Sequence, residues 1–424
     1  VKGADPVVHR VRVGRHGPVL SDVEPRAGGR VMAMRWTAHD PSPEFRALIG
    51  MNRARSAGEL LAALRDFRSP HQNVVFADVD GAFGYWMGGR VPVRRSGVGL
   101  LPVPGWTGEG DWTRYLEWEE HPHVLDPADG FVVTANNRQA GPEYPHHVGS
   151  QWAEPYRAMR IRELVERGSG LTAADMARQQ VDVVDAHALR YLPRALAAAR
   201  AAGDSAAARE LGAWNGEART DSRAAALFYV WYDALRRRVG HDEFRGKRVY
   251  FPRSVMNAVL DSGGSRWVDD VATPGTETLD GLSAEAMKEA VREVGSRTWG
   301  DLHATRIEHP LGAVAALDRA LGLNIGPFPN RGSPNTVNVS PYGGQKLPFL
   351  SGYGPSQRHV VDMGDVDGAG GFVIPTGQSG IPFSPHYRDQ TEMWREGRLW
   401  LIPLDRARSE ARAVSRMTLR PQER

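Results

Sequence analysis

A block of helical periodicity lies between two strand-rich regions of this chain, and this order limits the folds open to it. Apolar residues recur with the 3.6-residue period of a helix over four segments, 157–166, 172–181, 185–202 and 222–238. Thr172 with Asp175 forms an N-cap pattern, and Ser283 resembles an N-cap for a further helix to about Val294. Strands, then helices, then strands predict one α+β unit over 1–424, with a helical block at 155–300.

Short apolar or alternating runs bounded by Gly, Pro and Asp predict the strands on both sides of that block. Before it we expect strands at 7–13, 31–36 and 130–134, helical periodicity over 43–67, and a hairpin with an Asp-Gly turn from 73–81 and 83–87. After it we expect strands at 335–339, 359–362, 371–374 and 398–403 and a terminal helix at 405–414. Because the first strand begins so near residue 1, we expect the chain to start inside a domain.

Composition excludes several classes of protein. The 53 basic and 50 acidic residues are balanced and dispersed, so nothing indicates nucleic-acid binding. The absence of cysteine rules out disulfides, thiolate catalysis and Cys-based zinc sites. No window approaches the roughly 18 apolar residues of a membrane span. An enzyme-sized globular protein with no membrane or nucleic-acid partner is the expectation.

A series of short motifs runs in one order over nearly the whole chain. They are Arg15–Pro18, Arg35–Thr37, Asn73–Gly81, Leu101–Gly105, Thr134–Arg157, Trp299–His303, His309–Gly312, Gly354–Arg358, Thr376–Gly380 and Ser384–Gln390. This series resembles the penicillin acylase family of N-terminal-nucleophile amidohydrolases, and it covers the large subunit from roughly its second fifth to its C-terminus. The resemblance implies the four-layer αββα sandwich of that superfamily, with the helical block added.

The resemblance also implies a mechanism. In that family an N-terminal serine attacks the substrate amide and its own α-amino group acts as base, which a reference pKa of about 7.7–8.0 allows near neutrality. Val1 has no hydroxyl, so we expect the nucleophile and half of the oxyanion hole in a segment upstream of this chain. The resemblance further implies a small α subunit as partner and a periplasmic or secreted location. It requires no cofactor and allows a structural calcium ion, although His146 and His147 stand where some members have an acidic ligand.

Two residues of the chain match catalytic positions of the family. Asn136 matches the oxyanion-hole asparagine, and losing one such donor costs roughly 10²–10³ in rate. The alternative is that Asn136 caps the turn at Gly141, a role that Asn137 can also fill. Arg157 matches the arginine beside the nucleophile's amine, where a fixed cation lowers the pKa of the amine. Its alternative is an ordinary ion pair with Glu154 or Glu163 at the start of a helix.

Three further matches concern the pocket and a supporting acid. Trp36 and Gln72 match positions that line the acyl pocket, with a core tryptophan and a strand-end polar residue as the alternatives. A pocket lined by Trp36 suits an apolar acyl group. Asp362 matches an acid that in some members orients a histidine, and a turn residue explains it as well. The set around Ser379 does not form a nucleophile elbow, because Ile381-Pro382 opposes the helix that such an elbow needs.

The sequence therefore predicts an amidohydrolase that cleaves a small-molecule N-acyl amide through an acyl-enzyme. Two alternatives remain open. An acyltransferase or macrocyclase would use the same acyl-enzyme with an amine as acceptor, and a non-catalytic binding homologue would have lost its nucleophile. The sequence upstream of Val1 discriminates between the enzymes and the binding protein.

Overall fold

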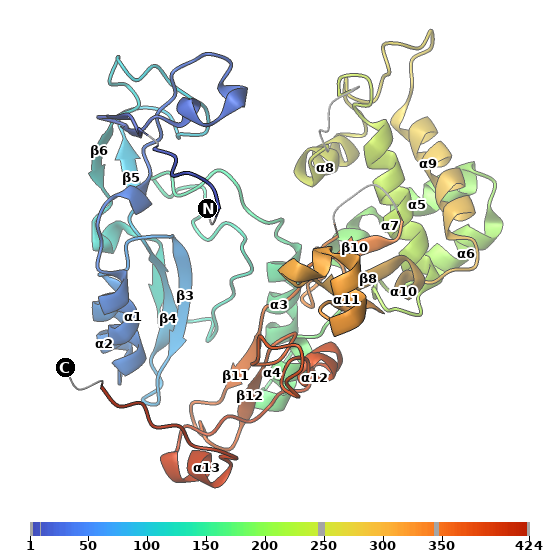
Figure 1. The fold of residues 1–424 in the computed structure, drawn as a ribbon. Coiled ribbons are helices and arrows are strands. Elements are labelled where there is room, and N and C mark those ends of the chain that lie inside the picture. The colour runs from blue at the N-terminus through green and yellow to red at the C-terminus, as the bar shows by residue number, and fades with distance from the viewer. Residues whose placement is uncertain (1–2, 9, 245–250, 343–346, 422–424) are drawn as a thin grey trace. The chain divides into compact units, whose positions relative to one another are not determined.

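The computed structural model describes residues 3–8, 10–244, 251–342 and 347–421, and the chain forms two compact units that divide between Ala153 and Glu154 (Figure 1). The division falls where the sequence predicts the helical block to begin. Val1, which the sequence analysis excludes as a nucleophile, lies outside the described residues. The single unit expected over 1–424 stays a prediction.

Turns dominate the first 40 residues, where strands were predicted. The strands β1 (Val13–Gly14) and β2 (Gly17–Pro18) form a two-stranded hairpin, followed by the 3₁₀ turns η1 (Leu20–Asp22), η2 (Pro25–Ala27) and η3 (Thr37–His39). The only other strand-like pairing among the described residues here is a single bridge between Val19 and Ala33. The predicted strands at 7–13 and 31–36 are therefore wrong in extent, because an alternating run becomes a strand only where a neighbour completes its backbone hydrogen bonds.

A three-stranded antiparallel sheet forms the centre of the first unit. Its strands are β3 (Gln72–Ala77), β4 (Phe83–Gly88) and β7 (His123–Leu125), in the order β3-β4-β7. The β3–β4 hairpin confirms the prediction, and the Asp78 carboxylate fixes its turn by accepting from the backbone N–H groups of Asp80 and Ala82. The helices α1 (Glu44–Arg53) and α2 (Ala57–Leu64) lie beside this sheet (Figure 1). Leu64, Phe76 and Trp86 form the core between them.

The opposite face of the same sheet has its own small core. Tyr85 and Met87 pack there with Val91 and Leu116, next to the hairpin of β5 (Pro92–Arg94) and β6 (Trp112–Tyr115). The turn η4 (Trp118–Glu120) belongs to the first core instead, where Trp118 stacks on Trp86. Val132 packs against the Tyr85 cluster, but residues 131–134 have no strand partner. The predicted strand at 130–134 is therefore wrong, although Val132 packs against the core.

Helices form the first half of the second unit. They are α3 (Tyr156–Glu166), α4 (Ala173–Gln179), α5 (Ala186–Ala201), α6 (Ser205–Ala213), α7 (Arg223–Arg238), α8 (Arg253–Ser262) and α9 (Leu279–Val294). The four predicted helices and the Thr172 capping box are confirmed. The predicted cap at Ser283 is wrong: Thr278 caps α9, and Ser283 is buried inside the helix, where it accepts from Trp231 Nε1 at 3.2 Å. Helix α7 is buried nearly all round, against α5 and α9 (Figure 1).

Short strands and helices complete the second unit. They are α10 (Trp299–Leu302), β8 (His303–Ile307), η5 (Pro310–Ala313), α11 (Ala315–Leu321), β9 (Ile325–Pro329), β10 (Phe349–Ser351), β11 (Arg358–Val361), β12 (Gly370–Val373), α12 (Thr391–Glu396) and α13 (Arg406–Ala411). The predicted strands at 359–362 and 371–374 and the terminal helix are confirmed as β11, β12 and α13.

Two predicted late strands are wrong. Residues 335–339 form a buried polar loop, in which Thr336 and Asn338 are held by hydrogen bonds, and the run at 398–403 contributes only a bridge from Trp400 to Phe372. Sequence analysis also missed the sheet β10-β8-β9. The mixture of helices and small sheets confirms the α+β class. No helix in the described part of the chain is long and apolar enough to cross a membrane.

Candidate active site

Asn136 occupies a conformation that few residues other than glycine adopt. Its φ of 62° lies in the left-handed region, and Asn136 and Asp126 are the only non-glycine residues with positive φ that the described backbone shows. Asparagine tolerates this region better than most residues. The side chain is exposed, whereas Ala135 just before it is buried. The backbone therefore turns Asn136 out of the packed interior.

Asn137 provides the side-chain hydrogen bonds of this turn. Its Oδ1 accepts from the backbone N–H of Ala135 at 3.1 Å, and its Nδ2 donates to the carbonyl of Arg138 at 3.1 Å. Gln139 Nε2 donates to the same Oδ1 at 3.1 Å. Asn137 thus stabilises the local fold, and the chemical role predicted for Asn136 remains to be tested.

The Asn136 turn is linked to the central hairpin through side chains. Tyr85 Oη donates to Asn73 Oδ1 at 2.7 Å, and Asn73 Nδ2 donates to Thr134 Oγ1 at 3.1 Å. Burial raises the pKa of the Tyr85 hydroxyl well above its ordinary value, so it remains a donor at neutral pH. On the other side, the Asn136 carbonyl accepts from the backbone N–H of Ala153 at 2.9 Å. Hydrogen bonds therefore hold the turn at both ends, on one side through the β3–β4 hairpin.

A pocket of about 350 Å³ opens in the same unit. Four stretches of chain line it: Arg35–Thr37, Ser69–His71, the β5–β6 hairpin with Val98, and His147–Ser150. Trp36 is 52% exposed and contributes its indole to the wall. The His147–Ser150 stretch ends three residues before Ala153, which bonds to Asn136. One short segment therefore connects the pocket wall to the Asn136 turn.

Gln72 is placed differently from Trp36. It is exposed at the start of β3, in register with Gly88, and it is absent from the residues that line the pocket. Its neighbour His71 lines the pocket instead, with Nε2 at 2.6 Å from the carbonyl of Arg90. Side chains of successive residues in an extended strand point to opposite faces, which explains why the match falls one residue away from the wall.

Sequence reasoning missed the other polar residues of the pocket. Arg35 bonds to Asp40, with 3.1 Å between Nη1 and Oδ1. Burial and the nearby Arg94 guanidinium lower the pKa values of His71 and His147, which favours their neutral forms at pH 7. Arg94 and Trp112 lie on adjacent strands of the β5–β6 hairpin. No sequence motif indicates these pocket residues, because the placement of Arg94 beside Trp112 depends on the register of two short strands.

Arg157 lies in the first turn of α3, in the second unit. A cation at a helix N-terminus opposes the helix dipole, and burial lowers the pKa of the Arg157 guanidinium. The helix dipole and burial both disfavour a positive charge at this position, so Arg157 does not stabilise α3 through its charge. Glu163, one of the two predicted ion-pair partners, is held by Arg160 at 2.9 Å and Arg167 at 2.7 Å.

The start of α3 is fixed by an aromatic contact. The Tyr156 ring packs edge-on against His187, with 5.0 Å between centroids, and His187 lies on α5. Tyr156 is the residue next to Arg157 and is buried. This contact holds the backbone that carries Arg157.

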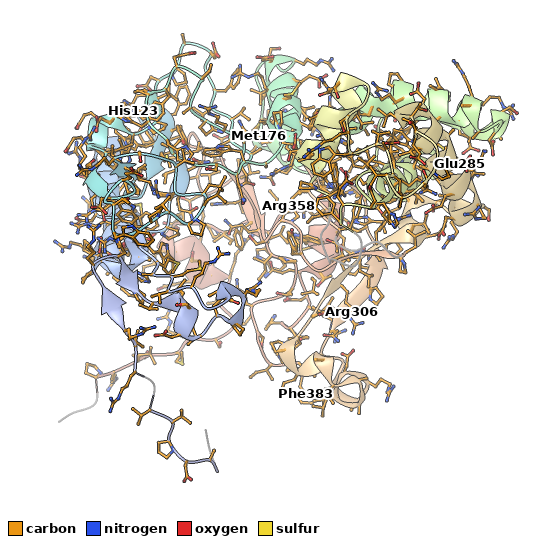
Figure 2. The ribbon with its side chains drawn as sticks, turned by 90° about the horizontal axis from the view of Figure 1, so that it is seen from above. His123, Met176, Glu285, Arg306, Arg358 and Phe383 are labelled. Atoms are coloured by element: carbon orange, nitrogen blue, oxygen red, sulfur yellow. The ribbon has the colours of Figure 1, made fainter. Side chains whose placement is uncertain are left out.

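Asp362 serves a turn in the structure. Its Oδ1 accepts from the backbone N–H of Gly364 at 2.9 Å, directly after β11. Arg358 at the start of that strand (Figure 2) donates to the Asn338 side chain at 2.6 Å and to the carbonyl of Trp394 at 2.5 Å. The alternative interpretation of Asp362 as a turn residue accounts for this geometry.

The remaining polar motifs also have structural roles. His386 Nδ1 lies 2.8 Å from Asp389 Oδ2, but the Ser379 hydroxyl accepts from the backbone N–H of Ile381 at 3.1 Å and no helix follows it. This confirms that the set is not a nucleophile elbow. The described residues contain no group of three or more His, Cys, Asp or Glu side chains arranged to hold a metal ion. The structural calcium ion that the resemblance allows stays a prediction.

Comparison with known proteins agrees with this architecture. A solved penicillin G acylase from Alcaligenes faecalis matches 100% of this chain and 81% of its own, with a TM-score of 0.63 and 18% identity. The likeness shows that this chain shares the mixed α+β fold of that structure.

Sequence comparison gives the family. The family model for penicillin amidase matches residues 1–411. The penicillin acylase 2 proenzyme of Pseudomonas sp. (strain SE83) is 31% identical over 411 residues, covering 94% of this chain and 52% of that protein. The acyl-homoserine lactone acylase QuiP of Pseudomonas aeruginosa is 29% identical over 458 residues, covering 95% and 54%. The chain belongs to the penicillin amidase family, and it spans about half the length of these two relatives.

Proposed function

We propose that this chain forms the major part of the large subunit of an enzyme that hydrolyses a small-molecule N-acyl amide. The observation that carries the proposal is the arrangement in the first unit. An exposed asparagine amide on a rigid left-handed turn is joined through residues 147–153 to a pocket with a tryptophan wall. A pocket that binds an acyl group beside a fixed amide donor is what cleavage of an acyl–nitrogen bond requires.

In the proposed reaction an N-terminal serine, on a segment that precedes this chain in the complete enzyme, attacks the acyl carbonyl. The serine's α-amino group takes the hydroxyl proton and returns it to the leaving amine. Asn136 donates its side-chain N–H to the oxygen that becomes negative in the tetrahedral intermediate. We assign to Arg157 the cation that lowers the pKa of the α-amino group. We also propose that the complete enzyme contains a small α subunit. One relative is named a proenzyme, which supports processing of a precursor into subunits.

The two adjacent asparagines offer a matched test. In the complete enzyme we expect Asn136→Ala to lower kcat roughly 10²–10³-fold, because one oxyanion donor is lost. Asn137→Ala should instead lower the free energy of unfolding by about 1–3 kcal/mol, because it leaves the turn's backbone groups unpaired. Both variants are measured for turnover of a chromogenic N-acyl amide and for urea unfolding. Unchanged turnover in Asn136→Ala would remove this residue from the reaction.

A further inference from the structure

Two arginines of the second unit meet at the C-terminal end of α12. Arg358 begins β11 and is only 4% exposed, and Arg331 lies partly buried in the segment after β9. Arg358 donates to the carbonyl of Trp394 at 2.5 Å, and Arg331 donates to the carbonyl of Arg395 at 3.1 Å. Because these carbonyls belong to consecutive residues, the two guanidinium groups are brought to one place from different parts of the chain.

Neither of these guanidinium groups has a carboxylate partner in the part of the chain that the structure describes. The acid in the first turn of α12, Glu392, is already held by Arg395 at 2.7 Å. Burial lowers the pKa of both Arg331 and Arg358, and the charge of Arg331 lowers the pKa of Arg358 further, to about 10. Both groups therefore stay positively charged at pH 7, and the described residues do not compensate that charge.

Each guanidinium also has a buried N–H that meets no acceptor. The Nε atoms of both arginines are inaccessible to solvent and have no hydrogen-bond partner among the residues described. Buried donors are normally paired with protein, with an ordered water or with an ion. A water molecule would accept these N–H groups but would leave both positive charges uncompensated. An anion would remove the cost of the unpaired donors and the cost of the buried charges together.

The free donors favour a small anion. In each arginine the Nη2 atom beside Nε already donates, from Arg331 to the Arg395 carbonyl and from Arg358 to Asn338 Oδ1 at 2.6 Å. The pair of parallel N–H groups with which arginine binds a carboxylate or a phosphate is therefore partly used. The Trp394 ring, with its centroid 4.9 Å from the Arg358 Cζ, covers one face of that guanidinium. A spherical ion accepts single donors from several directions, so a halide suits this arrangement better than an oxyanion.

We propose that Arg331 and Arg358 form a chloride site that joins the segment after β9, the strand β11 and the helix α12. The bound ion accepts both Nε–H groups and compensates the two charges, so it stabilises the second unit. This inference goes beyond the proposed function, because neither arginine has a part in the proposed reaction.

Urea unfolding of the 424-residue chain tests the site, in sodium chloride and in equal concentrations of sodium gluconate, whose anion is far larger. Once chloride exceeds its Kd, the unfolding equilibrium constant should fall about tenfold for each tenfold rise in chloride, relative to gluconate. Arg331→Gln should abolish this dependence. Arg395→Gln is the matched control, since it removes a guanidinium of the same helix that is paired with Glu392, and it should keep the dependence.

A second measurement needs no variant and therefore does not depend on whether Arg331→Gln folds. Bromide replaces chloride in such a site, and crystals of the wild-type chain soaked in sodium bromide should show an anomalous peak in contact with Nε of Arg331 and of Arg358. That peak together with the chloride dependence supports the site. Equal stability of the wild-type chain in the two salts, an equal response of Arg331→Gln and Arg395→Gln to chloride, or no peak at these atoms refutes it. A peak without chloride dependence would be an adventitious ion only, and it refutes the site as well.

Discussion

Replacing Asp185 should destabilise the second unit far more than the loss of a helix cap explains. This carboxylate is fully buried at the start of α5, where it accepts from the backbone N–H of Ala188 at 2.9 Å. It also accepts from Tyr229 Oη at 2.8 Å and from Ser333 Oγ at 2.5 Å. Asp185→Ala removes a cap worth about 1 kcal/mol and leaves two buried hydroxyl donors without an acceptor, at about 1–3 kcal/mol each. The expected loss is about 3–7 kcal/mol, a large part of the 5–15 kcal/mol typical of a domain.

Asp204 provides the matched control for this prediction. It caps α6 in the same way, accepting from the backbone N–H of Ala207 at 2.8 Å, but no other hydrogen bond to its side chain occurs within the described residues. Asp204→Ala should therefore cost only about 1 kcal/mol. Urea unfolding at pH 7, followed by tryptophan fluorescence and by circular dichroism, gives both values. If Asp185→Ala proves too unstable to purify, Tyr229→Phe removes one donor and should still cost more than Asp204→Ala. Losses within 1 kcal/mol of each other for Asp185→Ala and Asp204→Ala would refute the reasoning.

Two further predictions concern pH and the Asn136 turn. Burial lowers the pKa of His303 from 6.5 to about 4, so between these values the unfolded chain binds a proton that the folded chain does not. The free energy of unfolding is therefore highest above pH 6.5 and falls by up to about 3 kcal/mol as the pH drops toward 4. His303→Gln should show a smaller drop in the urea midpoint than the wild type between pH 7 and pH 4.5. An identical drop in both proteins would contradict the lowered pKa of His303. Asn73→Ala breaks the bridge from Tyr85 to Thr134 and should lower kcat roughly 10–100-fold with little change in KM, because the oxyanion donor is misplaced. A wild-type kcat in Asn73→Ala would show that the bridge does not position Asn136.

The helices could be predicted because their signals are local. The capping box of Thr172 and Asp175 and the periodicity of α5 and α7 lie within single segments, and each appears where the pattern places it. The strands β8 and β10 could not be predicted in this way, since His303 pairs with Phe349, which is far along the chain. The N-cap predicted at Ser283 is wrong because a serine shortly before a glutamate is a local capping pattern. In the structure Ser283 lies inside α9, and its Oγ accepts a hydrogen bond from Trp231 Nε1.

The predicted site residues stay predictions, and the structure shows where each of them lies. The motif order identified Trp36 and Asn136, and the structure places Trp36 in a pocket wall and Asn136 on an exposed turn. It could not identify Arg94, because the environment of that guanidinium depends on the bulge between Val93 and Arg94 and on space left by Gly99. Which residue of a pair faces a cavity, as with His71 and Gln72, is set by strand register rather than by residue type.

The pocket wall has a consequence for how the first unit holds together. Its lining comes from segments spread between Arg35 and Ser150, and the chain has no cysteine with which to cross-link them. Each segment contributes a few side chains, so the pocket exists only when all of them are in place at once. A ligand that binds there adds its binding free energy to the folding of the unit, by about 2.7 kcal/mol at a concentration one hundred times its Kd. Occupancy of the pocket thus acts as a reversible cross-link between distant parts of the chain, and the melting temperature of the first unit becomes a direct gauge of what the pocket prefers to hold.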